Sequence, residues 1–171
     1  MTYIKGLVFA AFCFASAMVR CQILVIGDVV NMREYNFSRV DSVMKLKGFE
    51  KTDDDNEPGF HIAKYSYVQK ADTAINRYDF VMGEQINEKR KTLRYVVWSK
   101  AAEEGVVKWL LGNGYKKKVT KFPSLGNESP DNFVQYIKGG VAITYLEEKN
   151  DDDKSDIKIR WAFELNIFNG R

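Results

Sequence analysis

The amino-acid sequence predicts an α+β domain in which two helices cover one face of an antiparallel sheet. Several segments carry apolar residues at every second position, which indicates strands with one buried face, as in antiparallel sheets. Two other segments carry apolar residues at helical spacing and end in glycine, which indicates two short helices. The segments follow the order helix, three strands, helix, three strands. This order predicts two tandem α-β-β-β units.

The two predicted helices cover residues 37–47 and 101–111. Asn36 or Ser38 can cap the start of the first, and Ser99 can cap the second, because these side chains accept backbone N–H bonds. A shift of 66 residues superimposes the two helices and predicts an internal duplication, with halves of about 36–98 and 99–168. The matching pairs are Val40 with Val106, Val43 with Trp109, Met44 with Leu110, Gly48 with Gly114 and Phe49 with Tyr115.

The strands are predicted from their two-residue period, which is clearest in the last of them. Gly139-Gly140 lies between two of the strands and predicts a tight hairpin. Residues 23–30 form a short apolar run, interpreted as an opening strand or a poorly ordered lead-in. The polar stretches 52–59 and 149–155 are predicted to be loops. The predicted strands are 61–68, 77–85, 91–98, 132–138, 141–147 and 156–168.

Residues 1–21 have the layout of a secretory signal peptide, with a positive start, a short apolar run and small residues before the cleavage site. Ala15 and Ala17 favour cleavage after Ala17, and cleavage after Cys21 is the alternative. A membrane-spanning helix fits less well, because Arg20 interrupts before the ~20 apolar residues that a span needs. Residues 22–171 are then expected to form a single exported domain.

Composition restricts the classes of function. The hydrophobic content of 45% is sufficient for a packed core. Formal net charge is +3, and loss of Lys5 and Arg20 with the leader lowers it to +1, which argues against a nucleic-acid partner. Of the two cysteines, Cys13 leaves with the leader and Cys21 is lost or remains alone. An exported domain without disulfides fits the bacterial periplasm or cell surface better than a eukaryotic extracellular space.

The residue patterns of common catalytic and metal sites are missing from the sequence. His61 is the single histidine, and no G-x-S-x-G or phosphate-binding glycine motif accompanies it. The acidic runs 53–55 and 151–153 lack the spacing of an EF-hand loop, so they are interpreted as solvated loops, with weak calcium binding left open. We therefore expect no catalytic residue, no metal site and no cofactor. A small hydrolase that uses two carboxylates is the remaining enzymatic alternative.

Arg94 and Trp98 are the candidate partner-binding residues. They have the opposite parity to Leu93, Tyr95 and Val97, so they lie on the open face of the sheet if the helices cover the second set. An exposed tryptophan beside arginine is typical of protein-binding hot spots, and such side chains also stack on sugars. The sequence thus favours a binding domain for a protein partner, with a small-ligand or carbohydrate-binding module as the alternative.

The element order over residues 37–168, two units of a short helix followed by antiparallel strands, resembles the β-lactamase inhibitor protein family. The resemblance implies an exported protein that binds other proteins through a concave sheet face. With the predicted leader, it favours a secreted or periplasmic protein of a bacterial envelope. We expect a protein partner, no nucleic acid and no permanent membrane span.

Overall fold

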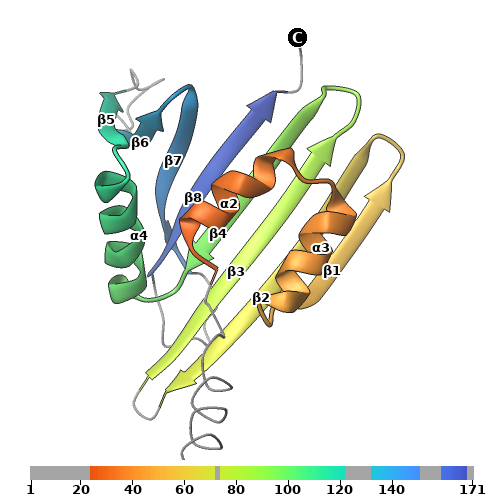
Figure 1. Ribbon diagram of the computed structural model, residues 1–171, viewed down its shortest axis with the longest axis horizontal. Coiled ribbons are helices and arrows are strands. Elements are labelled where there is room, and N and C mark those ends of the chain that lie inside the picture. The colour runs from red at the N-terminus through yellow and green to blue at the C-terminus, as the bar shows by residue number, and fades with distance from the viewer. Residues whose placement is uncertain (1–23, 72–73, 122–131, 151–158, 169–171) are drawn as a thin grey trace, which may run out of the picture.

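The computed structural model describes residues 24–71, 74–121, 132–150 and 159–168. Eight strands form one antiparallel sheet in the order β1-β2-β3-β4-β8-β7-β6-β5 (Figure 1). The α+β class is therefore confirmed. The helical elements are α2 (Ile26–Asn31), the 3-10 turn η1 (Met32–Glu34), α3 (Phe37–Leu46) and α4 (Lys100–Gly112). The strands are β1 (Glu50–Glu57), β2 (Phe60–Ala71), β3 (Ala74–Gln85), β4 (Arg90–Val97), β5 (Lys116–Lys121), β6 (Asn132–Lys138), β7 (Val141–Lys149) and β8 (Ile159–Phe168).

Within the described residues, three α-helices, instead of the predicted two, lie on one side of the sheet (Figure 1). The additional helix, α2, forms where the sequence predicted a strand or a lead-in. Ile26 and Val29 point into the core, and the Asp28 carboxylate accepts the backbone N–H of Val25 at 3.2 Å. The prediction is wrong because burial of this apolar stripe against the sheet outweighs the β propensity of its residues. α2 contacts both β4 and α4.

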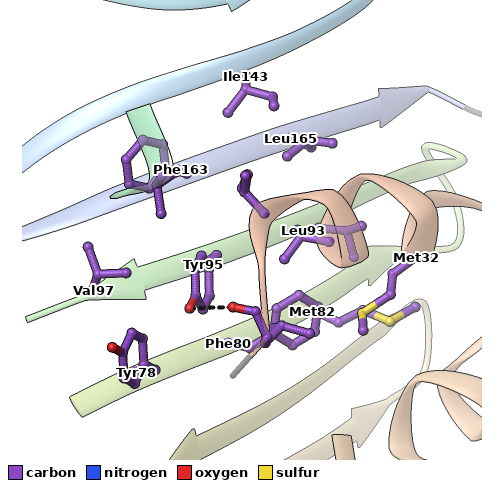
Figure 2. Close-up of a cluster of buried hydrophobic side chains, with 14 of the residues drawn as sticks. Met32, Tyr78, Phe80, Met82, Leu93, Tyr95, Val97, Ile143, Phe163 and Leu165 are labelled. Atoms are coloured by element: carbon purple, nitrogen blue, oxygen red, sulfur yellow. Dashed lines mark hydrogen bonds between the residues drawn. The ribbon is translucent and has the colours of Figure 1, made fainter. Parts of the chain in front are cut away.

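The core lies between the helices and the sheet face beneath them (Figure 2). Phe80, Tyr95 and Phe163 are its largest fully buried side chains and come from three strands that are adjacent in the sheet. The Tyr95 hydroxyl donates to the carbonyl oxygen of Leu24 at 2.7 Å. This bond ties the chain before α2 to the centre of the sheet. Burial raises the pKa of Tyr95 well above its ordinary value.

Both predicted helix starts are present in the structure. The Asn36 side chain accepts the backbone N–H of Arg39 at 2.9 Å, so Asn36 caps α3. The Ser99 hydroxyl accepts the backbone N–H of Ala102 at 3.3 Å and caps α4. Each cap satisfies one of the backbone donors that the first turn of a helix leaves without an intrahelical partner.

The two helices also end alike. Gly48 and Gly114 both have a φ of +81°, the left-handed conformation that glycine adopts without steric cost. The residue after each glycine donates its backbone N–H to a carbonyl five residues back, Phe49 to Met44 at 2.9 Å and Tyr115 to Leu110 at 3.0 Å. This is the Schellman motif, and its aromatic residue is buried in both cases. The predicted helix ends are confirmed.

Each of α3 and α4 is followed by four strands and not by the predicted three. The extra strands, β1 and β5, are the two edges of the sheet. Every side chain of β1 is exposed, so its sequence shows no apolar alternation, and the prediction of a loop at 52–59 is wrong. Edge strands are held by backbone pairing on one side and commonly carry charged side chains.

The hairpin predicted at Gly139-Gly140 joins β6 to β7, and both glycines have positive φ, +55° and +79°. The remaining predicted strands form with ends that shift by a few residues. The leader at 1–21 and the second acidic run, 151–153, lie outside the described residues. Among the residues that are described, no helix has the length and apolar character needed to cross a membrane.

Candidate partner-binding face

The side of the sheet opposite the helices, here named the open face, carries the predicted site residues. Side chains alternate along a strand, so Arg94 and Val96 of β4 project away from the core, which receives Leu93 and Tyr95. The register places Arg94 between Val81 of β3 and Glu164 of β8. Arg94 therefore lies on one of the two central strands of the sheet.

Arg94 belongs to a chain of ion pairs across β4, β8 and β7. Its guanidinium forms a close ion pair with Glu148 and lies 3.8 Å from Glu164. The other oxygen of Glu148 accepts the Nε–H of Arg160 at 3.0 Å. One carboxylate thus holds two arginines, and charge-assisted bonds of this kind fix guanidinium orientation.

Trp98 is connected to the same network. Its Nε1–H donates to Asp79 at 2.7 Å. The guanidinium carbon of Arg77 lies 4.6 Å from the ring centroid, and that of Arg160 lies 5.4 Å from it. Both distances are within the range of cation–π attraction. Arg160 therefore contacts Trp98 while it pairs with Glu148, which links the two predicted residues indirectly.

Trp98 is itself only 8% exposed. It belongs to a small apolar cluster with Val96, Ala162 and Leu146, separate from the core beneath the helices. The expectation that Trp98 is an exposed aromatic is therefore wrong. Sequence parity identifies the face on which a side chain lies, but not the neighbouring arginines that cover it.

The guanidinium groups, rather than the indole, meet solvent on the open face. The side chains of Arg77 and Arg160 are 48% and 35% exposed. Lys64 and Asp79 join the arginines around a cavity of about 230 Å³. The cations are paired: Lys64 with Asp53 at 2.7 Å, and Arg77 with Asp79 at 3.1 Å. The face presents fixed charges of both signs.

Sequence reasoning missed Arg77, Asp79, Glu148 and Arg160. The sequence did indicate their face of the sheet, because each of the four occupies a strand position next to an inward-facing position and so projects to the open face. Their relation to Arg94 and Trp98 depends on strand order, because β7 and β8 are far from β3 and β4 in the chain.

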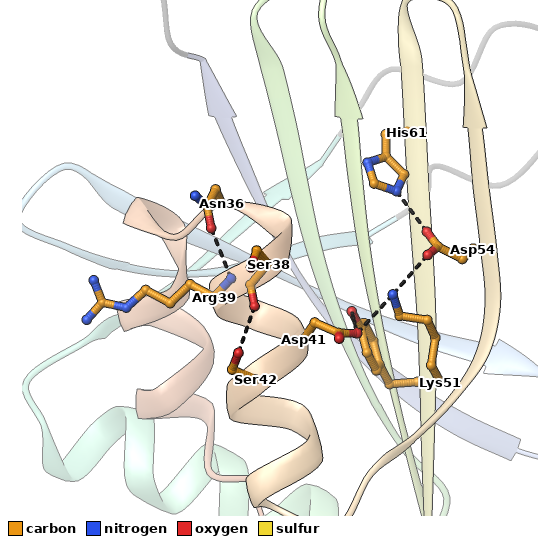
Figure 3. Close-up of polar contacts among 9 residues, drawn as sticks. Asn36, Ser38, Arg39, Asp41, Ser42, Lys51, Asp54 and His61 are labelled. Atoms are coloured by element: carbon orange, nitrogen blue, oxygen red, sulfur yellow. Dashed lines mark hydrogen bonds and ion pairs between the residues drawn. The ribbon is translucent and has the colours of Figure 1, made fainter.

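His61 lies in a second polar network, between α3, β1 and β2 (Figure 3). Its ring stacks on Phe37 with centroids 3.6 Å apart, and its Nε2 lies 2.8 Å from an Asp54 oxygen. The Lys51 ammonium lies 2.9 Å from both Asp41 and Asp54. These groups engage one another across three elements, which indicates that the network holds α3 against the edge of the sheet.

The pKa values in this network shift because opposite charges face each other. A hydrogen bond from Lys51 lowers the pKa of Asp41. The pKa of Asp54 is lowered by its hydrogen bond with His61, which has the larger effect, and by its hydrogen bond with Lys51. The same contacts with Asp41 and Asp54 raise the pKa of Lys51. Burial raises the pKa of Tyr65, whose hydroxyl donates to Asp41 at 3.1 Å, to about 12.

A cavity of about 270 Å³ lies on the covered side of the sheet and is largely apolar. Leu24 and Ile26 line it from the N-terminal side, Val106 and Trp109 from α4, and Tyr78 from the sheet. In the described part of the chain, no hydrogen-bond partner is found for the Tyr78 hydroxyl. The cavity offers a small ligand a mainly apolar environment.

Within the described ranges, no group of three or more His, Cys, Asp or Glu side chains is placed to hold a metal ion. Comparison of the chain with family models, with curated proteins and with solved structures finds no match. The function of the chain is therefore inferred from its geometry.

Proposed function

We propose that this protein is an exported, non-enzymatic binding domain that engages a protein partner through the open face of its sheet. The observation that carries the proposal is the group formed by Trp98, Arg77, Arg94 and Arg160 on that face. Tryptophan and arginine are the residue types most enriched among the residues that dominate binding energy at protein interfaces. Ion pairs and rigid strands already hold these side chains, which lowers the ordering cost of association.

In this proposal the guanidinium groups make the partner contacts, and Trp98 positions them. The ring of Trp98 supports Arg77 and Arg160, and its own position is fixed by the bond to Asp79. Because each arginine is paired with a carboxylate, the face does not act as a general anion site. A partner must instead present a complementary pattern of both signs, which favours specificity over electrostatic steering.

Export and duplication are part of the same proposal. The leader-like composition of residues 1–21 supports export. The matched caps and Schellman motifs of α3 and α4 support descent from one repeated unit. So does the sheet order, in which β1 to β4 run inward from one edge, β5 to β8 run inward from the other, and β4 pairs with β8 at the centre.

The proposal is tested by placing a photo-crosslinking amino acid at Val81, on the open face, and at Ser42, exposed on α3, in cells that export the protein. We expect position 81 to capture a defined protein that position 42 does not capture. The capture should be lost in Arg94→Glu/Arg160→Glu. It should persist in Lys45→Glu/Lys108→Glu, which makes the same charge change on two exposed helical lysines. Equal capture from both positions, or none from 81, would contradict the proposal.

The apolar cavity of about 270 Å³ supports a second candidate, a small-ligand-binding module. Cavities of about this size, with few polar groups, are typical of small-molecule sites. Titration with an apolar fluorescent probe should give saturable binding that Ala102→Phe, at the cavity wall, abolishes. Ala101→Phe is the matched control, because Ala101 is exposed on the same helix. Equal binding by both variants would remove this candidate.

A further inference from the structure

The two edge strands of the described sheet, β1 and β5, carry opposite charge. β1 has the sequence EKTDDDNE, with five acidic residues and one lysine. β5 has the sequence KKKVTK, with four lysines and no acidic residue. Edge strands present unpaired backbone N–H and C=O groups, which allow pairing with a further strand. The charges then determine which strand is accepted.

The charged side chains of both edges project mainly to the open face. On β1, the register pairs Asp53 with Lys64 and Glu50 with Ser66, residues that alternate with the buried Tyr65. Asp55 and Glu57 follow with the same two-residue period. On β5, Lys117 lies opposite Tyr136 in the register, and Tyr136 is buried in the core. The residues on either side of Lys117, Lys116 and Lys118, therefore project to the open face.

Several of these charges form no ion pair among the described residues. Asp53 pairs with Lys64, and Asp54 pairs with Lys51. Six charged residues of the two edges form no ion pair with any described residue. They are Glu50, Asp55 and Glu57 of β1 and Lys116, Lys117 and Lys118 of β5.

The topology makes the two edges geometrically compatible. All neighbouring strands are antiparallel and the sheet has eight of them, so β1 and β5 run in opposite directions. If a second copy lies beside the first in the same orientation, β5 of one copy meets β1 of the next as an antiparallel pair. The helices of both copies then lie on the same side, and the alternation of strand direction continues without a break.

We infer that this protein associates with itself edge to edge, with β5 of one copy paired to β1 of the next. Like charges oppose the pairing of two β1 edges or two β5 edges, so only the mixed contact is favourable. A paired segment as long as β5 spans about 20 Å. The contact is head-to-tail, so repeated association gives open chains or closed rings rather than a symmetric dimer. It leaves the open face of each copy free and does not depend on the function proposed above.

Sedimentation velocity of the purified protein tests this inference. At ~10 mM salt, where charges act over ~30 Å, the sedimentation coefficient should rise with protein concentration; at ~1 M salt, where they act over ~3 Å, the rise should disappear. Lys116→Glu/Lys118→Glu changes the net charge of β5 from +4 to 0, and Asp55→Lys/Glu57→Lys changes that of β1 from −4 to 0, so each variant loses the attraction between its own two edges. Each variant should weaken self-association at least ~10-fold, the equivalent of ~1.4 kcal/mol.

Mixing the two variants, and combining their substitutions in one chain, tests whether opposite edge charges drive the association. A mixture of the two variants should associate, because the unchanged acidic β1 of one variant then meets the unchanged basic β5 of the other. In a chain with all four substitutions, the reversed charges on β1 and β5 are again opposite in sign, so self-association should recover. The control, Lys45→Glu/Lys108→Glu, should associate like the wild type, and circular dichroism verifies that each variant is folded. A protein that stays monomeric at low salt, or a mixture that fails to associate, would overturn the inference.

Discussion

The two faces of the same sheet are built on different physical principles. On β4, Leu93, Tyr95 and Val97 are at most 1% exposed and form the core beneath the helices. On its other face, Arg94 joins a network of charged groups that solvent reaches. Apolar burial supplies most of the stability of a fold, whereas partly exposed ion pairs contribute little. The open face can therefore change its chemistry with little effect on folding, and the covered face cannot.

The sharpest test compares two consecutive residues of β8. Phe163 is fully buried, and Phe163→Ala should lower the free energy of unfolding by ~3–5 kcal/mol, because it removes apolar contacts and leaves a cavity. Glu164 lies on the open face beside Arg94, and Glu164→Ala should cost ~0–1 kcal/mol. Urea denaturation measures both. Similar losses for the two variants would remove the distinction between the faces.

A smaller effect is expected from the hydrogen bond that ties the chain before α2 to the covered face. Tyr95→Phe removes the donor to the Leu24 carbonyl and should cost ~1–3 kcal/mol. Tyr78→Phe is the matched control, since its ring is stacked on Tyr95 and no partner for its hydroxyl is found among the described residues. Thermal unfolding should separate the two variants. If Tyr78→Phe lowered the stability as much as Tyr95→Phe does, the prediction would be contradicted.

The helices over the covered face depend on the glycines that end them. Gly114→Ala should cost ~1–2 kcal/mol, because φ is +81° and an added Cβ meets no neighbour that would mask the backbone strain. Gly105→Ala, inside α4 and equally free of neighbours, should stabilise by ~0.5–1 kcal/mol. Chemical denaturation should therefore give opposite signs. The same sign for both variants would contradict the prediction.

The smallest effect concerns the polar network at the side of α3. The pKa values of Asp41 and Asp54 are below the ordinary value. The stabilisation from these ionised groups is thus complete above the ordinary pKa of ~3.9 and is lost as pH falls through the lower folded values. Lys51→Met should flatten this acid-side loss in denaturation curves recorded across that range. Lys45→Met, on exposed α3, should leave it unchanged.

The sequence alone allowed much of the covered face to be predicted and only part of the open face. Two-residue periods identified six of the strands, and parity placed Arg94 and Trp98 opposite the core. Burial of Trp98 was not predictable, because Arg77 and Arg160 reach it from other strands. Their positions depend on a strand order that no local pattern encodes.

Local chemistry determined the ends of α3 and α4, the Gly139-Gly140 hairpin and the inward residues of the strands, because caps, positive φ and side-chain alternation act over a few neighbouring residues. Only the tertiary structure decided that α2 is a helix and that β1 and β5 are strands. α2 is held by a core assembled from distant segments, and the two edges are held by backbone bonds to their neighbours, which leave no trace in side-chain hydrophobicity.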